Sequence, residues 1–234
     1  MKGGKQPDPG AGERVSSRKG CGNMEKRNYQ REMEAEIARL SGRRPPLLLH
    51  SCCGPCSSAV LERLTEHFRV TLLYYNPNIE PEAEYRHRLA EQQRLLSLLP
   101  GDIPLLPCEY DHEAFAAFAP ALAEAKEGGE RCLACFALRL NYTARQAALH
   151  GFEYFTTTLS VSPHKNADNV NRVGEAAGKE YGVRYLFADF KKKNGYLRSL
   201  QLSKQYGLYR QDYCGCLYSR GKNDGDAEKS SIIV

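Results

Sequence analysis

The sequence contains three short groups of cysteines whose spacing suits the binding of a metal ion or an iron–sulfur cluster. Seven of the nine cysteines fall in these groups: Cys52-Cys53-x-x-Cys56, Cys132-x-x-Cys135 and Cys214-x-Cys216. Cysteines that act only as small buried hydrophobic residues would not cluster in this way. The pairs Cys52/Cys53 and Cys132/Cys135 together offer four thiolates, enough for a tetrahedral zinc ion or for a [4Fe–4S] cluster.

The composition of the chain favours a compartment in which these thiols stay reduced. The 234 residues are 41% hydrophobic and 26% charged, which is typical of globular proteins. No apolar stretch approaches the roughly 20 residues of a membrane span, and no signal peptide is recognisable. We therefore expect a cytoplasmic protein without a membrane partner, whose cysteines serve metal or redox chemistry and not a disulfide framework.

The first cysteine group lies where a strand is expected to pass into a helix. The apolar run 47–50 predicts a short buried strand, and Pro55 fits the first turn of a helix. Free backbone N–H groups at a helix start stabilise thiolates. Gly54 permits a tight turn, so Cys52 and Cys53 can present sulfur to a common centre. A disulfide between these neighbours would be strained.

The second and third groups predict different uses. Cys132 and Cys135 are spaced so that both sulfurs lie on one face of a helix. A disulfide between Cys214 and Cys216 would close a small strained ring and be easily reduced. The sequence alone therefore allows a redox-active pair at Cys214 and Cys216 or two ligands for a further iron.

The remaining cysteines give weaker signals. Cys56 is expected one turn into its helix, where it either lines the site or is buried. Cys108 follows an expected strand, and this position predicts that it lies in the core. Cys21 falls in a Gly/Lys/Pro/Ser-rich stretch expected to be disordered.

The order of strand and helix patterns predicts an α/β fold. Residues 1–24 are expected to form a disordered tail, 25–222 a single α/β domain that begins with an amphipathic helix from Asn28, and 223–234 a C-terminal tail. The expected strands are 47–50, 70–75, 103–106, 153–161 and 184–189, and the main expected helices are 55–68, 82–99, 112–126, 132–150 and 166–181. Such alternation indicates a parallel sheet with helices on both faces.

The net charge of +5 is concentrated in a region that is also rich in tyrosine. Residues 191–222 hold eight basic residues and one acidic residue. Cations can follow a phosphate backbone while aromatic rings stack on unpaired bases, so this pattern favours single-stranded loops of RNA. The expected RNA-binding residues are Lys191, Lys192, Lys193, Tyr196, Arg198 and Arg210, with His164 and Lys165 at an expected strand end.

Six motifs together resemble the QueH-type epoxyqueuosine reductases. They are LLLHSCCGPC, YYNPNIEPEAEYRHR, GGERCLACFALRL, TTTLSVSPHKN, FADFKKKNGY and LYRQDYCGC. They occur in order from about Asn28 to Tyr218. With this resemblance we expect a parallel sheet of the nucleotide α-hydrolase-like (HUP) class.

The resemblance implies reduction of epoxyqueuosine at the tRNA wobble position to queuosine, the last step of queuosine synthesis, without cobalamin. It implies a [4Fe–4S] cluster held by Cys52, Cys53, Cys132 and Cys135. Cys214 and Cys216 would be the redox-active catalytic pair, or would bind an additional mononuclear iron. Asp189, which heads the basic segment, is a candidate proton donor or iron ligand, or else an ordinary helix cap; a nearby tyrosine is the other candidate proton donor. The partners would be tRNA carrying epoxyqueuosine and an electron donor that the sequence does not identify.

Three other readings compete with this one. A zinc-binding, RNA-binding protein without catalytic activity would use the cysteines of the first two groups as ligands of a structural zinc site. An ATP-using tRNA-modification enzyme would carry a Ser-Gly-Gly phosphate loop where HSCCGPC stands, so the sequence argues against it. A thiol–disulfide exchange protein would need only one cysteine pair.

Overall fold

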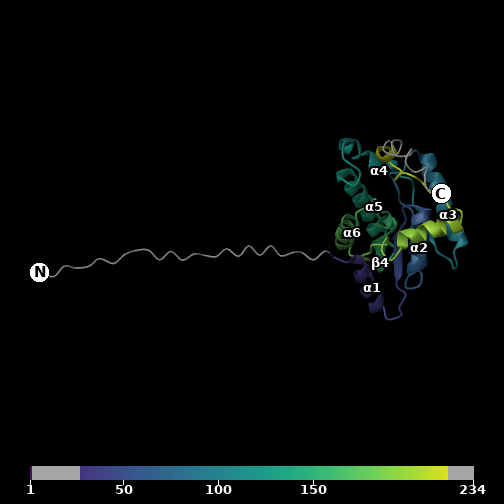
Figure 1. Ribbon diagram of the computed structural model, residues 1–234, viewed down its shortest axis with the longest axis horizontal. Helices are drawn as coiled ribbons and strands as arrows, with labels where there is room; N and C mark the ends of the chain where they lie inside the picture. The colour runs from purple at the N-terminus through teal and green to yellow at the C-terminus, as the bar shows by residue number, and fades with distance from the viewer. Residues whose placement is uncertain (2–26, 221–234) are drawn as a thin grey trace, which may run out of the picture.

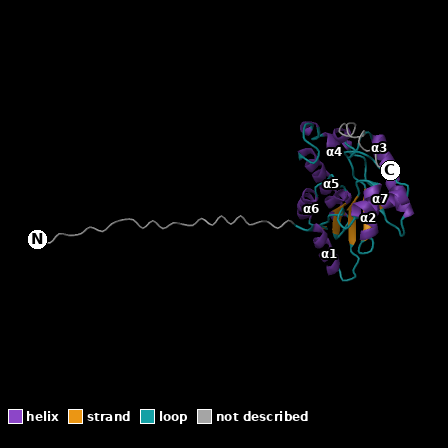
Figure 2. Cartoon of the chain, viewed as in Figure 1, coloured by secondary structure: helices purple, strands orange, loops and turns teal. Residues whose placement is uncertain are grey.

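The computed structural model describes Met1 and residues 27–220, which form a parallel β-sheet covered by helices (Figures 1 and 2). The strand order is β3-β2-β1-β4-β5, an order found in doubly wound α/β folds. The five strands are β1 (Pro46–His50), β2 (Arg69–Leu73), β3 (Leu105–Leu106), β4 (Tyr154–Thr157) and β5 (Arg184–Tyr185). The α/β class and the parallel sheet expected from the sequence are confirmed.

The sheet separates two layers of the hydrophobic core. Leu47 and Leu49 of β1 pack with Met33 and Leu61 on one face. Leu48 points to the other face and packs in a second cluster with residues such as Leu140 and Val170. All three leucines of β1 are buried. The continuous apolar run of this strand is typical of a strand that is covered on both faces.

The helices follow the strands as the sequence predicts. They are α1 (Tyr29–Arg39), α2 (Gly54–Leu64), α3 (Glu82–Leu98), α4 (His112–Ala116), α5 (Glu130–Leu149), α6 (Ala167–Tyr181), α7 (Gly195–Gln205) and α8 (Leu217–Arg220). Asn28 caps α1 through a hydrogen bond from the Arg31 amide, and Asn166 caps α6 in the same way. α5 packs against α6, and α2 packs against α7.

Several element boundaries differ from the sequence-based expectation. The strand expected over 153–161 ends at Thr157, because the Thr157 hydroxyl accepts from the Leu159 amide and begins a 3₁₀ turn, Thr158–Val161. The helix expected over 112–126 is broken into α4 and a 3₁₀ turn that begins at Pro120. The expected strand 184–189 is paired only over Arg184–Tyr185.

The two expected tails lie almost wholly outside the described residues. Within the described part of the chain, no helix is both long and apolar enough to cross a membrane.

Candidate active site and metal centre

The first cysteine group lies at the carboxyl end of the central strand. β1 ends at His50, and Cys53 is the N-cap residue of α2. The sulfur atoms of Cys52, Cys53 and Cys56 all lie within 4.8 Å of one another. Cys56, whose role the sequence left open, therefore belongs to the same group of thiols and can share a metal centre with its neighbours.

The strands on either side of β1 hold this cysteine loop in place. The Thr158 hydroxyl, just beyond β4, accepts from the Cys52 amide (3.0 Å) and donates to the Cys52 sulfur (3.2 Å). The Asn76 side chain, beyond β2, donates to the Ser51 carbonyl at 2.9 Å. The register that pairs His50 with Thr157 and Leu73 thus brings three strand ends to one point.

The three neighbouring thiols differ in acidity. Hydrogen bonds from Cys53 and Cys56, together with the cations of Lys165 and Arg139, hold the pKa of Cys52 well below its usual value, although burial opposes them. The shared hydrogen bond with Cys52 raises the pKa of Cys53 to about 12. Contact with Cys52 likewise raises the pKa of Cys56. The group therefore carries one thiolate that its neighbours stabilise.

We expect Cys52 to react first when metal-free protein is treated with iodoacetamide at pH 7. The thiolate is the reactive form and exists above the thiol pKa. The alkylation rate of Cys52 should not change with pH around pH 7. The alkylation rate of Cys135, whose pKa is about 12, should rise with pH up to that value. At pH 7 the difference should be ~100-fold or more. Peptide mass spectrometry over time measures both rates, and equal rates would contradict the assignment of the thiolate.

The second and third groups face each other across a small cavity. Cys132 and Cys135 lie in the first two turns of α5, and both line this cavity with Cys214 and Cys216. The Gly128 amide donates to the Cys132 sulfur at 3.2 Å. Burial raises the pKa of Cys135. None of the eight cysteines of the described residues forms a disulfide in this structure.

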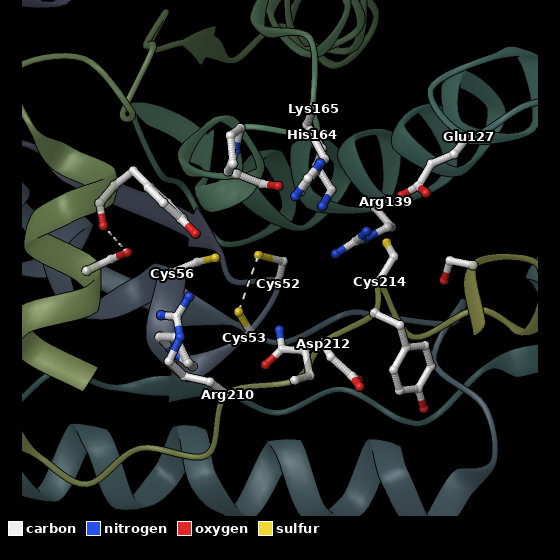
Figure 3. A pocket seen from close by; sticks show the side chains of 18 residues that line it. Cys52, Cys53, Cys56, Glu127, Arg139, His164, Lys165, Arg210, Asp212 and Cys214 are labelled. Carbon is white, nitrogen blue, oxygen red and sulfur yellow. Dashed lines mark hydrogen bonds between the residues drawn. The ribbon is translucent and has the colours of Figure 1, made fainter. Parts of the chain in front are cut away.

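A larger cavity of about 330 Å³ adjoins the first (Figure 3). Cys52, Cys53 and Cys56 lie on its wall. Cys214, His164, Lys165 and Glu127 line both cavities, which therefore meet at these side chains. Seven thiols thus line two neighbouring cavities.

A buried arginine joins the cysteine groups. Arg139 of α5 is 2% exposed and lines the larger cavity. Its guanidinium donates to Asn76 Oδ1, and its Nη1 lies 4.0 Å from the Cys135 sulfur. Its Nε lies 3.3 Å from His50 Nε2. Burial, and then the charge of Arg139, lowers the pKa of His50 to about 3, so His50 is neutral at pH 7.

A second cation, Lys165, points into the same space (Figure 3). Burial alone would lower its pKa, but electrostatic interactions with Cys214, Cys52 and Cys56 together outweigh burial and raise it. Lys165 is therefore charged at neutral pH. Two cations facing seven thiols fit a site that holds negative charge, as a thiolate-bound iron–sulfur cluster does.

Seven of the eight residues expected to bind RNA separate into two sets, and Lys191 belongs to neither. His164, Lys165, Tyr196 and Arg210 line the larger cavity. Lys192, Lys193 and Arg198 line a different pocket. There Lys193 is paired with Glu34, and Arg198 with Glu62 at 2.6 Å.

Asp189 is not among the residues that line either cysteine cavity. Its carboxylate instead pairs with Lys191 at 2.8 Å. The structure therefore does not bring the expected proton donor Asp189 to the thiols.

Sequence reasoning missed the cavity residues Arg139, Glu127 and Asp212. Arg139 stands four residues after Cys135 on a helix, a spacing that places both on one face. That spacing was the signal that could have identified it. No comparable signal marked Glu127 or Asp212.

Residues 47–222 match the sequence profile of the family described as epoxyqueuosine reductase QueH. The chain belongs to the QueH family of epoxyqueuosine reductases. It is therefore an enzyme of the oxidoreductase class.

Curated relatives cover most of the chain. It is 40% identical over 201 residues to the QueH of Streptococcus pyogenes, a match that spans 83% of this chain and 79% of the relative. It is 38% identical over 210 residues to the QueH of Staphylococcus epidermidis, across 86% of this chain and 88% of the relative. The family profile covers all three cysteine groups of this QueH chain.

A search of solved structures also found a more distant similarity. The U34-tRNA thiolase NcsA from Methanococcus maripaludis, solved with its [4Fe–4S] cluster, has a TM-score of 0.46 and 12% identity to this chain. The match covers 81% of this chain and 67% of NcsA.

Proposed function

We propose that this protein reduces epoxyqueuosine in tRNA to queuosine. The reaction breaks both C–O bonds of an epoxide and forms a carbon–carbon double bond. Two electrons and two protons convert the released oxygen to water. The observation that carries the proposal is the gathering of seven thiols and two buried or half-buried cations along two neighbouring cavities in a QueH-family chain.

Cys52, Cys53, Cys132 and Cys135 are the proposed ligands of a [4Fe–4S] cluster. Their chemistry fits, because thiolates hold such clusters, and two of these sulfurs accept hydrogen bonds from Thr158 and Gly128. Cys56 supplies a further thiol within reach of the first pair. When bound, such a cluster would supply electrons.

Cys214 and Cys216 are the proposed source of the reducing equivalents. Oxidation of two thiols to a disulfide releases two electrons and two protons, which matches the needs of epoxide removal. An electron donor outside this chain must then reduce the disulfide. The alternative role for this pair is to hold an additional mononuclear iron, as their place beside Cys132 and Cys135 allows.

The proposed substrate is an unpaired nucleotide of a tRNA anticodon loop. A cavity of about 330 Å³ suits a single flipped-out base, which proteins commonly hold between polar and aromatic side chains. We assign His164, Lys165, Tyr196 and Arg210 to the contact with that nucleotide and its phosphates. Lys191, Lys192, Lys193 and Arg198 would contact the RNA backbone further away.

We expect Cys214→Ala to retain the four-iron centre and to lose turnover by ~1,000-fold or more, because the two-thiol source of electrons is broken. The assay incubates anaerobically loaded protein and a chemical reductant with tRNA that contains epoxyqueuosine. Nucleoside mass spectrometry then measures the loss of one oxygen atom.

The same assay on the wild-type protein tests the proposed function. Formation of queuosine would support it, and an unchanged nucleoside with cluster-loaded protein would refute it. Full turnover by the Cys214→Ala variant would remove that cysteine from the reaction.

A further inference from the structure

The motif YYNPNIEPEAEYRHR (74–88) forms a cradle for the segment that carries the third cysteine group. It comprises the loop after β2 and the first turns of α3. The Glu80 amide donates to the Gly215 carbonyl at 2.9 Å. The Tyr209 hydroxyl donates to Glu84 at 3.2 Å. These contacts bring residues more than 120 positions apart together beside the site.

Arg88 is the centre of this cradle. Its side chain is 2% exposed, and its Nε donates to Glu84 Oε1 at 2.7 Å. Its Nη1 lies 3.4 Å from the Cys214 carbonyl oxygen, and its guanidinium lies 4.8 Å from the ring centre of Tyr213. The guanidinium therefore contacts the cysteine segment at two consecutive residues.

The residue between the two cysteines also fits closely against this cradle. Gly215 has a φ of +113°, a conformation that favours glycine. A Cβ atom at this position would lie 2.8 Å from Ile79 Cγ1 and 3.2 Å from Arg88 Nη1. The turn is thus shaped to pass directly over the guanidinium.

Burial makes this arrangement unfavourable for an arginine with only a structural role. Within the described residues, Arg88 Nη2 is buried without a hydrogen-bond partner. Desolvation of a charge and an unpaired donor both oppose folding. The neighbouring pair Arg86–Glu82 has the same i,i+4 spacing on α3, but both side chains are more than half exposed. That exposed pair stabilises the helix without burying a charge, whereas Arg88 is buried.

We propose that Arg88 is a positioning residue that clamps the Cys214-Gly215-Cys216 turn so that both thiols face the cysteine cavity. The clamp acts on the backbone of Cys214 and on the ring of Tyr213, and Glu84 fixes the guanidinium from the opposite side. The functional consequence of the clamp rests on the proposed function, because it matters for turnover only if this cysteine pair reacts.

The test compares Arg88→Met with the control Arg86→Met in anaerobically loaded protein. Alkylation of Cys214 and Cys216 by iodoacetamide is followed by peptide mass spectrometry. We expect Cys216, which is 8% exposed, to react about tenfold faster or more in Arg88→Met, the change that loss of one hydrogen bond from a charged group produces. The control should match the wild type, and the iron content of both variants should be unchanged.

The turnover kinetics of the same variants provide a second measurement. We expect kcat to fall in Arg88→Met while the KM for tRNA stays the same, because the substrate cavity does not include Arg88. Arg88→Lys keeps the charge, but one ammonium group cannot reach Glu84 and the Cys214 carbonyl together. This variant should therefore fold like the wild type but have the lowered kcat of Arg88→Met. If Arg88→Met does not fold, Gly215→Ala tests the same contact from the other side and should show the same faster alkylation.

The outcomes separate the clamp from the proposed reaction. Faster alkylation with unchanged turnover would support the clamp and remove the cysteine pair from the reaction. Unchanged alkylation in folded Arg88→Met, or in Gly215→Ala where Arg88→Met does not fold, would overturn the clamp.

Discussion

Replacing Cys132 with alanine is expected to abolish binding of the iron–sulfur cluster and to lower turnover by ~1,000-fold or more. This exceeds the roughly 10- to 100-fold loss that follows removal of an outer partner of a metal ligand. Cys132 lines the smaller cavity with three other cysteines and accepts a hydrogen bond from the Gly128 amide. Its removal would take a ligand from the proposed set and leave that amide without its sulfur partner.

Cys108→Ala is the matched control for this prediction. Cys108 is also half-buried, but its thiol donates to the Tyr74 carbonyl and lines neither cavity. Iron and acid-labile sulfide should be lost in Cys132→Ala and retained in Cys108→Ala. Full iron content in Cys132→Ala would exclude this cysteine from the ligand set.

Replacing Arg139 with methionine is expected to affect both stability and the redox properties of the site. The substitution removes the donor to Asn76 Oδ1 and the neighbour of His50 Nε2. Buried polar groups left without a partner typically destabilise by about 1–3 kcal/mol each. We therefore expect the free energy of unfolding to fall by about 2–4 kcal/mol.

The charge of Arg139 provides the second expected effect. A cation near a cluster and its thiolates stabilises the reduced, more negative state. Arg139→Met should therefore lower the reduction potential of the bound cluster and reduce kcat. Denaturant unfolding measures the first effect, and a redox titration followed by electron paramagnetic resonance measures the second.

Arg145→Met is the control for Arg139, because Arg145 lies on the same helix and is exposed. It should change neither the potential nor the stability. In Arg139→Lys the reduction potential should fall less than in Arg139→Met, because the positive charge remains. The hydrogen bonds of the guanidinium should still be lost. An unchanged potential in Arg139→Met would show that this cation does not act on the cluster.

The cysteine groups could be predicted because they depend on local sequence and on one rule of parallel sheets. Carboxyl ends of neighbouring strands meet at one edge, so the loops after β1 and β4 lie side by side. The hydrogen bonds between Cys52 and Thr158 follow from this arrangement. The approach of Cys214 to the same cavity depends on the packing of residues 209–216 against α3, which the sequence pattern does not reveal.

The basic segment shows the limit of charge patterns. Lys193 and Arg198 pair with Glu34 and Glu62, which lie 159 and 136 positions earlier in the chain. A sequence pattern cannot show partners that only tertiary structure brings together. Arg139 illustrates the converse case, because its spacing from Cys135 predicts a shared helix face but does not show that the arginine is buried beside two cysteine groups.

The most direct test is the iron and acid-labile sulfide content per chain, with an optical spectrum, of protein purified without oxygen. We predict about four irons with matching sulfide and a broad visible absorbance. A fifth iron would indicate that Cys214 and Cys216 hold a separate metal ion. Zinc without sulfide, persisting after iron–sulfur reconstitution, would contradict the proposed chemistry and leave a zinc-binding protein with an RNA-binding surface.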